Sequence, residues 1–227
     1  MILNFNLEDI VAQAITKNLE LAKNNYQPAE HQFRISTIAY CTRRIYFDKV
    51  NPEKQEIDIY SKGKMVAGNV LHEFLETYLS NNFPSEELLI ETEISYKHKD
   101  IELIGHPDIV ANNKVIDIKT CSEKSFNYRL NDDRPAFHHF YQVNCYACIL
   151  KKDIASILYL NKEDLYPIER SLPIEEHYFL NALEKAQAIY QHLKQKTIPG
   201  PDYEEDWECR YCPYKNHCND LEEDQNQ

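Results

Sequence analysis

Two strand-like stretches that carry acidic residues are separated by one pair of asparagines, and this arrangement constrains the fold most strongly. The stretches are residues 101–110 and 114–120, and Asn112–Asn113 stand between their inner ends. A two-residue loop rich in Asn favours a tight β-hairpin, because Asn tolerates the positive φ angles that such turns require. If these residues form the loop, Val110 pairs with Val115, and Asp108 faces Asp117.

The predicted hairpin brings together three charged side chains, those of Asp108, Asp117 and Lys119. Two carboxylates roughly 5 Å apart at Cβ repel each other and cost stability. Lys119 shares the face of Asp117, because side chains alternate along a strand. This combination suits a hard divalent cation bound through oxygen, with Lys119 activating a water or stabilising charge on a phosphate. A register slip of one residue would separate the acids and leave an exposed hairpin with scattered charges.

The order of these residues, Pro107-Asp108 and then Asp117-Ile118-Lys119, resembles the signature of the PD-(D/E)XK nucleases. The resemblance implies a restriction-endonuclease-like α/β fold, with a central mixed β-sheet flanked by helices. It implies Mg²⁺ or Mn²⁺ held by Asp108, Asp117 and the Ile118 carbonyl. It also implies that Lys119 positions or deprotonates the attacking water. Many relatives carry Glu where this chain has Asp117.

A long helix is expected over residues 60–82, and His72 lies within its apolar stripe. A single His in such a stripe is ordinarily a packing or surface residue. The segment from Gly68 to His72 resembles the helix that precedes the metal site in RecB-like nucleases, so the resemblance adds His72 to the metal ligands. Glu93, on a strand expected over 88–97, is a further candidate carboxylate, with a solvated strand face as the alternative.

Gln142 and Tyr146 stand four residues apart on a helix expected over 135–151, and therefore share one face. Taken alone, this spacing indicates ordinary packing for Tyr146 and a surface position for Gln142. The spacing also resembles the motif that follows the active-site Lys in RecB-like nucleases. That resemblance implies that both residues act in the catalytic site and orient the DNA strand.

Three cysteines stand within ten residues near the C-terminus, at Cys209, Cys212 and Cys218. Three thiolates leave a four-coordinate site one ligand short; Cys41 is the best candidate for the fourth and His217 a weaker one. Zinc and an iron–sulfur cluster are both chemically possible. One early Cys followed by this late triplet resembles the iron–sulfur staple of AddB-like nucleases and of the fourth CRISPR-associated (Cas) protein family. The resemblance implies a [4Fe–4S] cluster, rather than zinc, that ties the N-terminal segment to the C-terminus.

The remaining elements fit a single domain that spans residues 1–227. We divide it into a helical N-terminal segment (1–55), a nuclease core (56–198) and a cysteine motif with an acidic tail (199–227). Further helices are expected over 7–24, from Ser36 onward and over 173–196, with strands over 155–160 and 166–172. Residues 122–134 read as polar and irregular.

The formal net charge of −12 argues against a broad nucleic-acid-binding face. A nuclease of this composition would need a local basic groove and a metal. No apolar run approaches the roughly 20 residues of a membrane span, and the first residues lack the features of a signal peptide. We therefore expect a cytoplasmic protein with no membrane partner.

Taken together, these resemblances imply a metal-dependent DNA exonuclease that acts on single-stranded ends. They also imply that it trims precursors of new CRISPR spacers alongside the CRISPR integrase. One alternative is a nuclease of the same fold in DNA repair, recombination, a mobile element or a virus. Another is a non-catalytic iron–sulfur or zinc protein that binds a partner, which would predict a damaged active site. Cleavage polarity and oligomeric state are left open.

Overall fold

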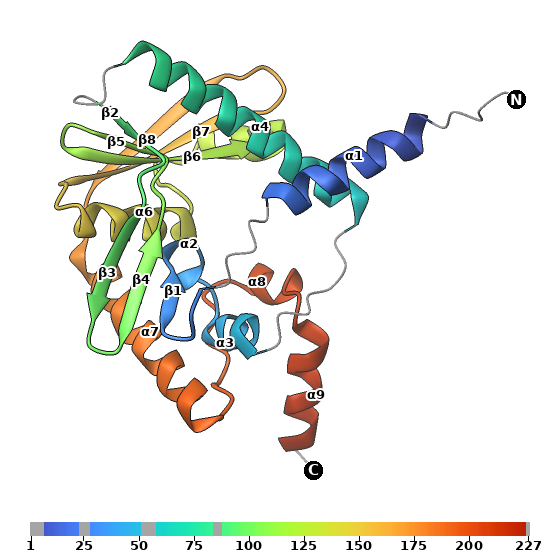
Figure 1. Ribbon diagram of the computed structural model, residues 1–227, viewed down its shortest axis with the longest axis vertical. Coiled ribbons are helices and arrows are strands. Elements are labelled where there is room, and N and C mark those ends of the chain that lie inside the picture. Colours follow the sequence, from blue (N-terminus) through green and yellow to red (C-terminus); the bar gives the residue numbers. More distant parts are fainter. Residues whose placement is uncertain (1–6, 23–27, 51–57, 84–87, 226–227) are drawn as a thin grey trace, which may run out of the picture.

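The computed structural model describes residues 7–22, 28–50, 58–83 and 88–225, which form two β-sheets flanked by helices (Figure 1). The strands are β1 (Gln32–Arg34), β2 (Leu88–Ile90), β3 (Ile94–His98), β4 (Ile101–Gly105), β5 (Ile109–Ala111), β6 (Lys114–Cys121), β7 (Ile154–Asn161) and β8 (Pro167–Pro173). The helices are α1 (Leu7–Ala22), α2 (Ile35–Ile38), α3 (Thr42–Val50), α4 (Ile59–Asn82), α5 (Glu123–Leu130), α6 (Phe137–Ile149), α7 (Glu176–Gln195), α8 (Asp206–Arg210) and α9 (Lys215–Gln225). None of the helices described is both long and apolar enough to cross a membrane.

Both sheets are mixed, where the sequence led us to expect one central sheet. The larger sheet has the order β2-β5-β6-β7-β8, in which only β6 and β7 run parallel. The smaller sheet has the order β1-β4-β3, with β1 parallel and β3 antiparallel to β4. The α/β class is therefore confirmed, and the sheet is divided in two.

The β5–β6 hairpin forms with the predicted loop and the predicted register. Val110 pairs with Val115 and Ala111 with Lys114, which leaves Asn112 and Asn113 as the loop. Asn112 has a φ of 47°, the positive value for which an Asn is suited. The local turn chemistry therefore set the pairing on which the site depends.

Two stretches that we expected to be continuous strands are broken, and both were wrong as single elements. The stretch 101–110 divides into β4 and β5 around Pro107, which has no amide hydrogen to donate to a ladder. The stretch 88–97 divides into β2 and β3 after Glu91, whose φ is 47°. The chain changes sheet at both breaks, and Glu93, which we expected on a strand, lies between β2 and β3.

Several helices also differ from expectation. The helix expected from Ser36 is two short ones, α2 and α3, separated by residues 39–41. Residues 122–134 are not irregular, because α5 begins after Ser122, which occupies the N-cap position. Pro173 ends β8 and does not start a helix; α7 begins at Glu176, and its C-cap residue, Lys196, has a left-handed conformation.

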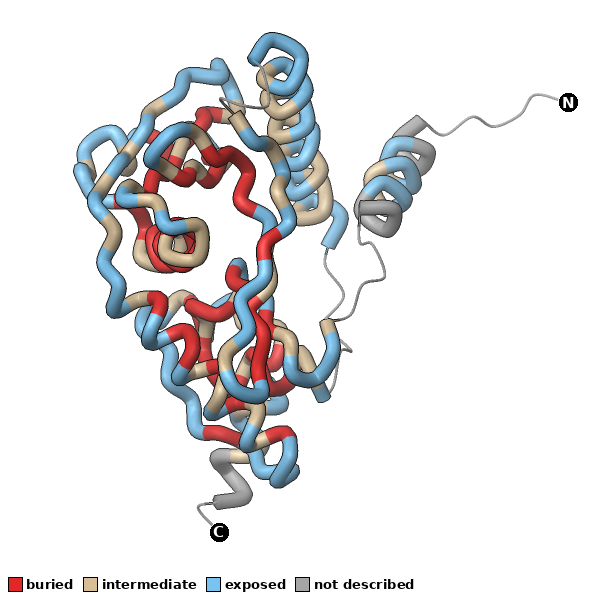
Figure 2. Tube along the Cα trace, turned by 60° about the vertical axis from the view of Figure 1, so that its left-hand side comes forward, coloured by how far each residue is buried: buried red, intermediate tan, exposed pale blue. Residues whose placement is uncertain are grey.

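The core lies in the sheets and in the helices α2, α3, α6 and α7, whereas α4 lies across the larger sheet without a buried residue (Figure 2). Helix α6 buries a continuous run from Phe140 to Ala147. The expected apolar stripe of α4 is largely solvated, since Val70, Phe74 and Tyr78 are more than half exposed. The long helix was predicted correctly, but its expected burial was wrong.

Candidate functional site

Strand β6 carries Asp117 and Lys119 on one face at the centre of the site. Lys119 Nζ lies 2.8 Å from Asp117 Oδ2, and Asp117 is 1% exposed. Burial alone would lower the pKa of Lys119, but the carboxylates of Asp117 and Asp108 outweigh it and raise that pKa. Lys119 is therefore an ammonium group at neutral pH, a hydrogen-bond donor and a positive charge.

Asp108 follows Pro107 at the point where the chain enters the larger sheet. Its Oδ2 accepts a hydrogen bond of 2.5 Å from the amide of Ile118, which holds the carboxyl group beside β6. Burial, followed by the negative charge of Asp117, raises the pKa of Asp108 to about 8. Asp108 lies one residue before the β5–β6 ladder, whose last pair is Ile109–Ile116, so the predicted direct pairing with Asp117 is not part of the ladder, although the two acids are close.

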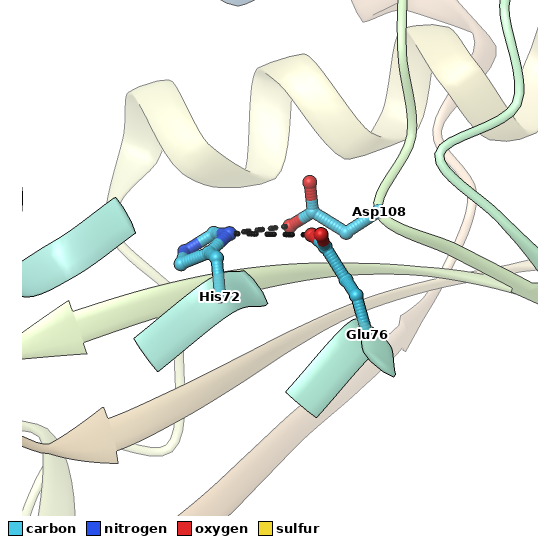
Figure 3. A group of neighbouring side chains, drawn as sticks. All are labelled: His72, Glu76 and Asp108. Carbon is cyan, nitrogen blue, oxygen red and sulfur yellow. Dashed lines mark ion pairs between the residues drawn. The ribbon is translucent and has the colours of Figure 1, made fainter. Parts of the chain in front are cut away.

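Helix α4 contributes His72 and Glu76, which point toward Asp108 from the other side (Figure 3). His72 Nδ1 lies 3.8 Å from Asp108 Oδ2 and 3.8 Å from Glu76 Oε1. One ligand atom from each residue lies within 4.8 Å of the other two. Burial, and then the charge of Lys119, lowers the pKa of His72, so its neutral ring offers a lone pair to a cation.

Ile118 contributes to the site through its backbone, because its side chain is fully buried. Its amide donates to Asp108. Ile118 also lines the same hollow as His72.

Gln142 and Tyr146 lie behind β6 and hold Asp117 from α6. Gln142 Nε2 donates to Asp117 Oδ1 at 2.9 Å and to the Tyr146 hydroxyl at 3.1 Å. Their exposed fractions are 7% and 2%, so they position Asp117 and have little surface with which to orient DNA directly. Tyr146 packs against Gly105, where an added Cβ would lie 2.5 Å from Tyr146 Cε1.

The site residues fit a divalent cation, because one of their buried oxygen atoms makes no hydrogen bond. Among the residues described, Asp117 Oδ2 is one of three buried side-chain oxygen or nitrogen atoms without a hydrogen bond. The Lys119 ammonium group lies 2.8 Å from this oxygen, and a carboxylate oxygen has a second lone pair that a cation could use. Carboxylate and carbonyl oxygens with one imidazole form a donor set suited to Mg²⁺ or Mn²⁺.

A hollow of about 340 Å³ opens beside the site, between α4 and β6. Three lysines contribute to its walls, although the chain as a whole is strongly acidic. Its lining is Lys64, Met65, Gly68, Asn69, His72, Ile118, Lys119, Thr120 and Lys162. The hollow supplies the local positive charge that a polyanionic substrate requires at this site.

The four cysteines singled out in the sequence come from both ends of the chain and gather in one region. Burial raises the pKa of the Cys209 thiol most, and the nearby thiols of Cys41, Cys212 and Cys218 raise it further. Within the described ranges, no three of these thiols come within 4.8 Å of one another, the limit that His72, Glu76 and Asp108 meet. Tetrahedral zinc would hold its sulfurs about 3.8 Å apart.

Contacts between protein groups already tie the N-terminal segment to the C-terminal one around these cysteines. Arg43 Nη1 donates to Cys218 Sγ at 2.9 Å, and the amide of Cys41 donates to buried Glu208 at 3.1 Å. The hydroxyl of Tyr214 donates to Asp48 at 3.0 Å. His217, the weaker candidate ligand, is exposed and its ring packs against Phe47.

Sequence reasoning missed Glu76 and its neighbour Glu91. Burial, followed by the charge of Glu91, raises the pKa of Glu76 to about 7, so the two carboxylates lie close together. Glu93, considered from the sequence, is exposed and is not part of the His72–Glu76–Asp108 group. The sequence did contain a signal for Glu76, because it stands at i+4 from His72, the same spacing that linked Gln142 to Tyr146.

Comparison with known proteins agrees with this arrangement. A family model described as the PD-(D/E)XK nuclease superfamily matches residues 53–219. Among solved structures, SSO0001 is similar with a TM-score of 0.66 and 19% identity, over 94% of this chain and 96% of that one. The alkaline exonuclease LHK-Exo from Laribacter hongkongensis is similar with a TM-score of 0.51 and 14% identity, over 73% and 93%. LHK-Exo in complex with dAMP gives a TM-score of 0.55 at 12% identity, over 74% and 91%. No curated protein matches the sequence.

Proposed function

Because the chain belongs to the PD-(D/E)XK nuclease superfamily, we propose that it is a metal-dependent exonuclease that hydrolyses single-stranded DNA from its ends. The observation that supports this most strongly is the convergence of Asp108, Asp117 and Lys119 with His72 at one point. A non-catalytic protein would have no reason to retain two buried acids in mutual repulsion. The similarity in fold to exonucleases supports action on strand ends.

Asp108, Asp117, His72, Glu76 and the Ile118 carbonyl would hold Mg²⁺ or Mn²⁺. When bound, such a cation lowers the pKa of a coordinated water and stabilises negative charge on the phosphate. The raised pKa of Lys119 favours a role as a charged donor to the phosphate or the attacking water, and disfavours a role as the base that deprotonates it. Gln142 keeps Asp117 in place for this chemistry.

The test is cleavage of end-labelled single-stranded DNA by anaerobically purified protein, with Mg²⁺, Mn²⁺ or a chelator. We expect wild type to require the cation and Lys119→Ala to lose at least about 100-fold in rate. Exposed Lys97 provides the matched control, since Lys97→Ala should behave as wild type. Circular DNA of the same sequence separates the modes of attack, because an exonuclease leaves it intact. A well-folded wild type that cleaves no DNA end would sink the proposal.

We also propose that Cys41, Cys209, Cys212 and Cys218 bind a [4Fe–4S] cluster. The gathering of these thiols from both ends of the chain, in the motif order that resembles the iron–sulfur staple, supports this proposal. Purified protein should show the visible absorption of an iron–sulfur cluster and should contain iron and sulfide. Cys209→Ser should lose both, whereas Cys148→Ser on α6 should keep them. One zinc per chain in a colourless protein would replace this proposal with the zinc alternative.

The cellular role that we propose is the trimming of precursors for new CRISPR spacers alongside the CRISPR integrase, in the cytoplasm. It rests on the order of the motifs along the chain, from Cys41 through Asp108 to Cys218. Co-purification with the integrase from a host that carries both genes tests it. A gene neighbourhood of repair or viral functions, with no integrase bound, would favour the repair or mobile-element alternative.

A further inference from the structure

Three partly buried aromatic rings from distant segments meet between the acidic site and the cysteine region. Tyr40 precedes Cys41, His138 stands in the first turn of α6, and Trp207 lies in α8. The ring centroids are 5.9 Å apart for Tyr40 and His138, 5.2 Å for His138 and Trp207, and 6.4 Å for Tyr40 and Trp207. We call these three residues the aromatic platform.

The aromatic platform is connected to the strand that carries Lys119 through Tyr159, which pairs with Lys119 in the β6–β7 ladder. The Tyr159 hydroxyl lies 3.3 Å from His139 Nδ1, and the ring centroids of His139 and His138 are 4.2 Å apart. Burial, and next the positive charge of Lys119, lowers the pKa of His138 to about 4. His138 is therefore uncharged at neutral pH, and the three rings form an uncharged aromatic surface beside a catalytic ammonium group.

Charges of both signs surround the rings: the Glu205 carboxylate accepts a hydrogen bond from Trp207 Nε1, and two arginines contribute positive charge. The guanidinium carbon of Arg44 lies 4.2 Å from the centroid of the Tyr40 ring. Arg129 lies 5.6 Å from the centroid of Tyr159, and its charge also lowers the pKa of His138. Aromatic rings interleaved with cations are the surface on which single-stranded nucleic acids bind, bases on the rings and phosphates on the cations.

We propose that the aromatic platform stacks the bases of a single DNA strand whose scissile phosphate lies at Lys119, an inference that rests on the proposed nuclease function. A single strand fits because its bases expose their faces, whereas those of a duplex are stacked on one another. Stacking tolerates every base, so the surface would guide a strand to the active site with little regard to sequence. It also gives Tyr40 and Trp207 a role apart from the cysteines beside them.

The competing explanation is that the rings only pack α8 against α6. A double-mutant cycle separates the two, because packing cannot depend on what the DNA carries. The cycle pairs removal of the Tyr40 ring with removal of the DNA bases. It compares Tyr40→Leu with wild type, and an ordinary oligonucleotide of about 12 residues with an abasic one of the same length.

The measurement is the fluorescence anisotropy of labelled oligonucleotide with the intact protein, without added divalent cation. We expect Tyr40→Leu to bind the ordinary strand about 5- to 100-fold more weakly and to bind the abasic strand as wild type does. Tyr40→Phe, which keeps the ring, should restore affinity. Equal loss for both strands, or no loss for either, would overturn the platform.

Tyr190 on α7 provides a matched control. It is partly buried, and Lys194 Nζ lies 4.2 Å from its ring centroid, as Arg44 lies over Tyr40. Because Tyr190 is outside the proposed strand path, Tyr190→Leu should bind both strands as wild type does. Arg44→Gln adds an independent check. If Arg44 contacts a phosphate, its removal should lower by about one the number of ions released on binding, which is measured from the slope of log affinity against log salt concentration.

A second substrate separates failure of the platform from failure of the proposed function. The p-nitrophenyl ester of thymidine 5′-monophosphate reports on the reacting centre without a strand to stack. If the protein cleaves both the DNA and the ester, and the double-mutant cycle shows no coupling, the proposed role of the aromatic platform is refuted and the nuclease function stands. Cleavage of neither overturns the nuclease function, and strong coupling in the cycle would still support the platform as a binding surface.

Discussion

The candidate cation site has a sheet side and a helix side, and the two are built differently. On the sheet side, Asp117 and Ile118 are buried in β6, and Gln142 holds Asp117 by a hydrogen bond. On the helix side, His72 and Glu76 project from α4, a helix with no buried residue, and contact their partners at 3.8 Å. Packing fixes the first, whereas the second is held by polar contacts of side chains that remain partly exposed.

This difference separates two tasks that a metal-dependent nuclease must perform. The sheet side carries the groups that must already be in place when the reaction begins, since preorganised charge is what accelerates it. The helix side can adjust to a cation because little packing resists its movement. Substitutions on the sheet side should therefore affect the reaction itself, and those on the helix side should affect cation affinity.

The largest expected effect is on the sheet side. Asp117→Asn keeps the shape of the side chain but removes the negative charge that pairs with Lys119 and, in the proposed function, would bind the cation. We expect the cleavage rate to fall roughly 1,000-fold and excess Mn²⁺ to leave it low. Rates measured at saturating cation, with exposed Asp100→Asn as the control, check this. More than a tenth of the wild-type rate would contradict the role assigned to Asp117.

A smaller effect of another kind is expected on the helix side. Glu76→Gln should weaken cation affinity by about 10- to 100-fold, because the ligand set loses a charge while the sheet side stays intact. Raising the Mn²⁺ concentration should then restore the rate toward wild type. Exposed Glu93, outside the group, is the matched control. A rate that stays low at every Mn²⁺ concentration would place Glu76 in the reaction and remove the distinction between the two sides.

The packing behind the sheet side is tested by two glycines. Gly105→Ala places a methyl group 2.5 Å from Tyr146 Cε1, while the same change at Gly200 meets no atom within 4 Å. Neither glycine has a positive φ, so space alone distinguishes them. We expect Gly105→Ala to lower the free energy of unfolding by about 1–3 kcal/mol and Gly200→Ala to change it little. Urea denaturation measures both, and equal effects would show that Tyr146 moves freely.

The smallest effect concerns His138 and the acid side of the stability profile. Its pKa is lowered by burial from 6.5 to about 4, so protonation favours the unfolded chain. The folded state keeps its full stability above pH 6.5 and loses it as the pH falls toward 4. Over this pH range the free energy of unfolding of His138→Asn should fall by about 1 kcal/mol less than that of wild type. The effect is small because the side chain is only partly buried. Exposed His177→Asn should retain the wild-type profile; an unchanged profile in His138→Asn would refute the assignment.

Local rules in the sequence accounted for much of the site. Asn112–Asn113 gave the hairpin its register, and through it the closeness of Asp108 to the strand that carries Asp117. The expected helix over 60–82 is α4 to within one residue at its start. These elements could be predicted because turn residues and helical periodicity act within a few residues.

The division of the expected strands could not be predicted in the same way. Residues 101–110 have strand-forming side chains on both sides of Pro107, and the pattern is equally compatible with one strand or two. The choice depended on whether the second half could pair with β6 while the first half paired with β1 and β3. Such pairings join residues far apart in the sequence, and no local preference records them.

The sequence by itself determined the chemistry, namely two acids and a lysine at hairpin spacing, a histidine on a helix, and cysteines at both ends. It did so because residue identity and short-range geometry are enough to define such groups. Only the tertiary structure decided that α4 lies unburied across the sheet, so that Glu76 joins His72, and that Gln142 is buried behind Asp117. Burial and long-range contact depend on how the elements pack, and packing is a property of the whole chain.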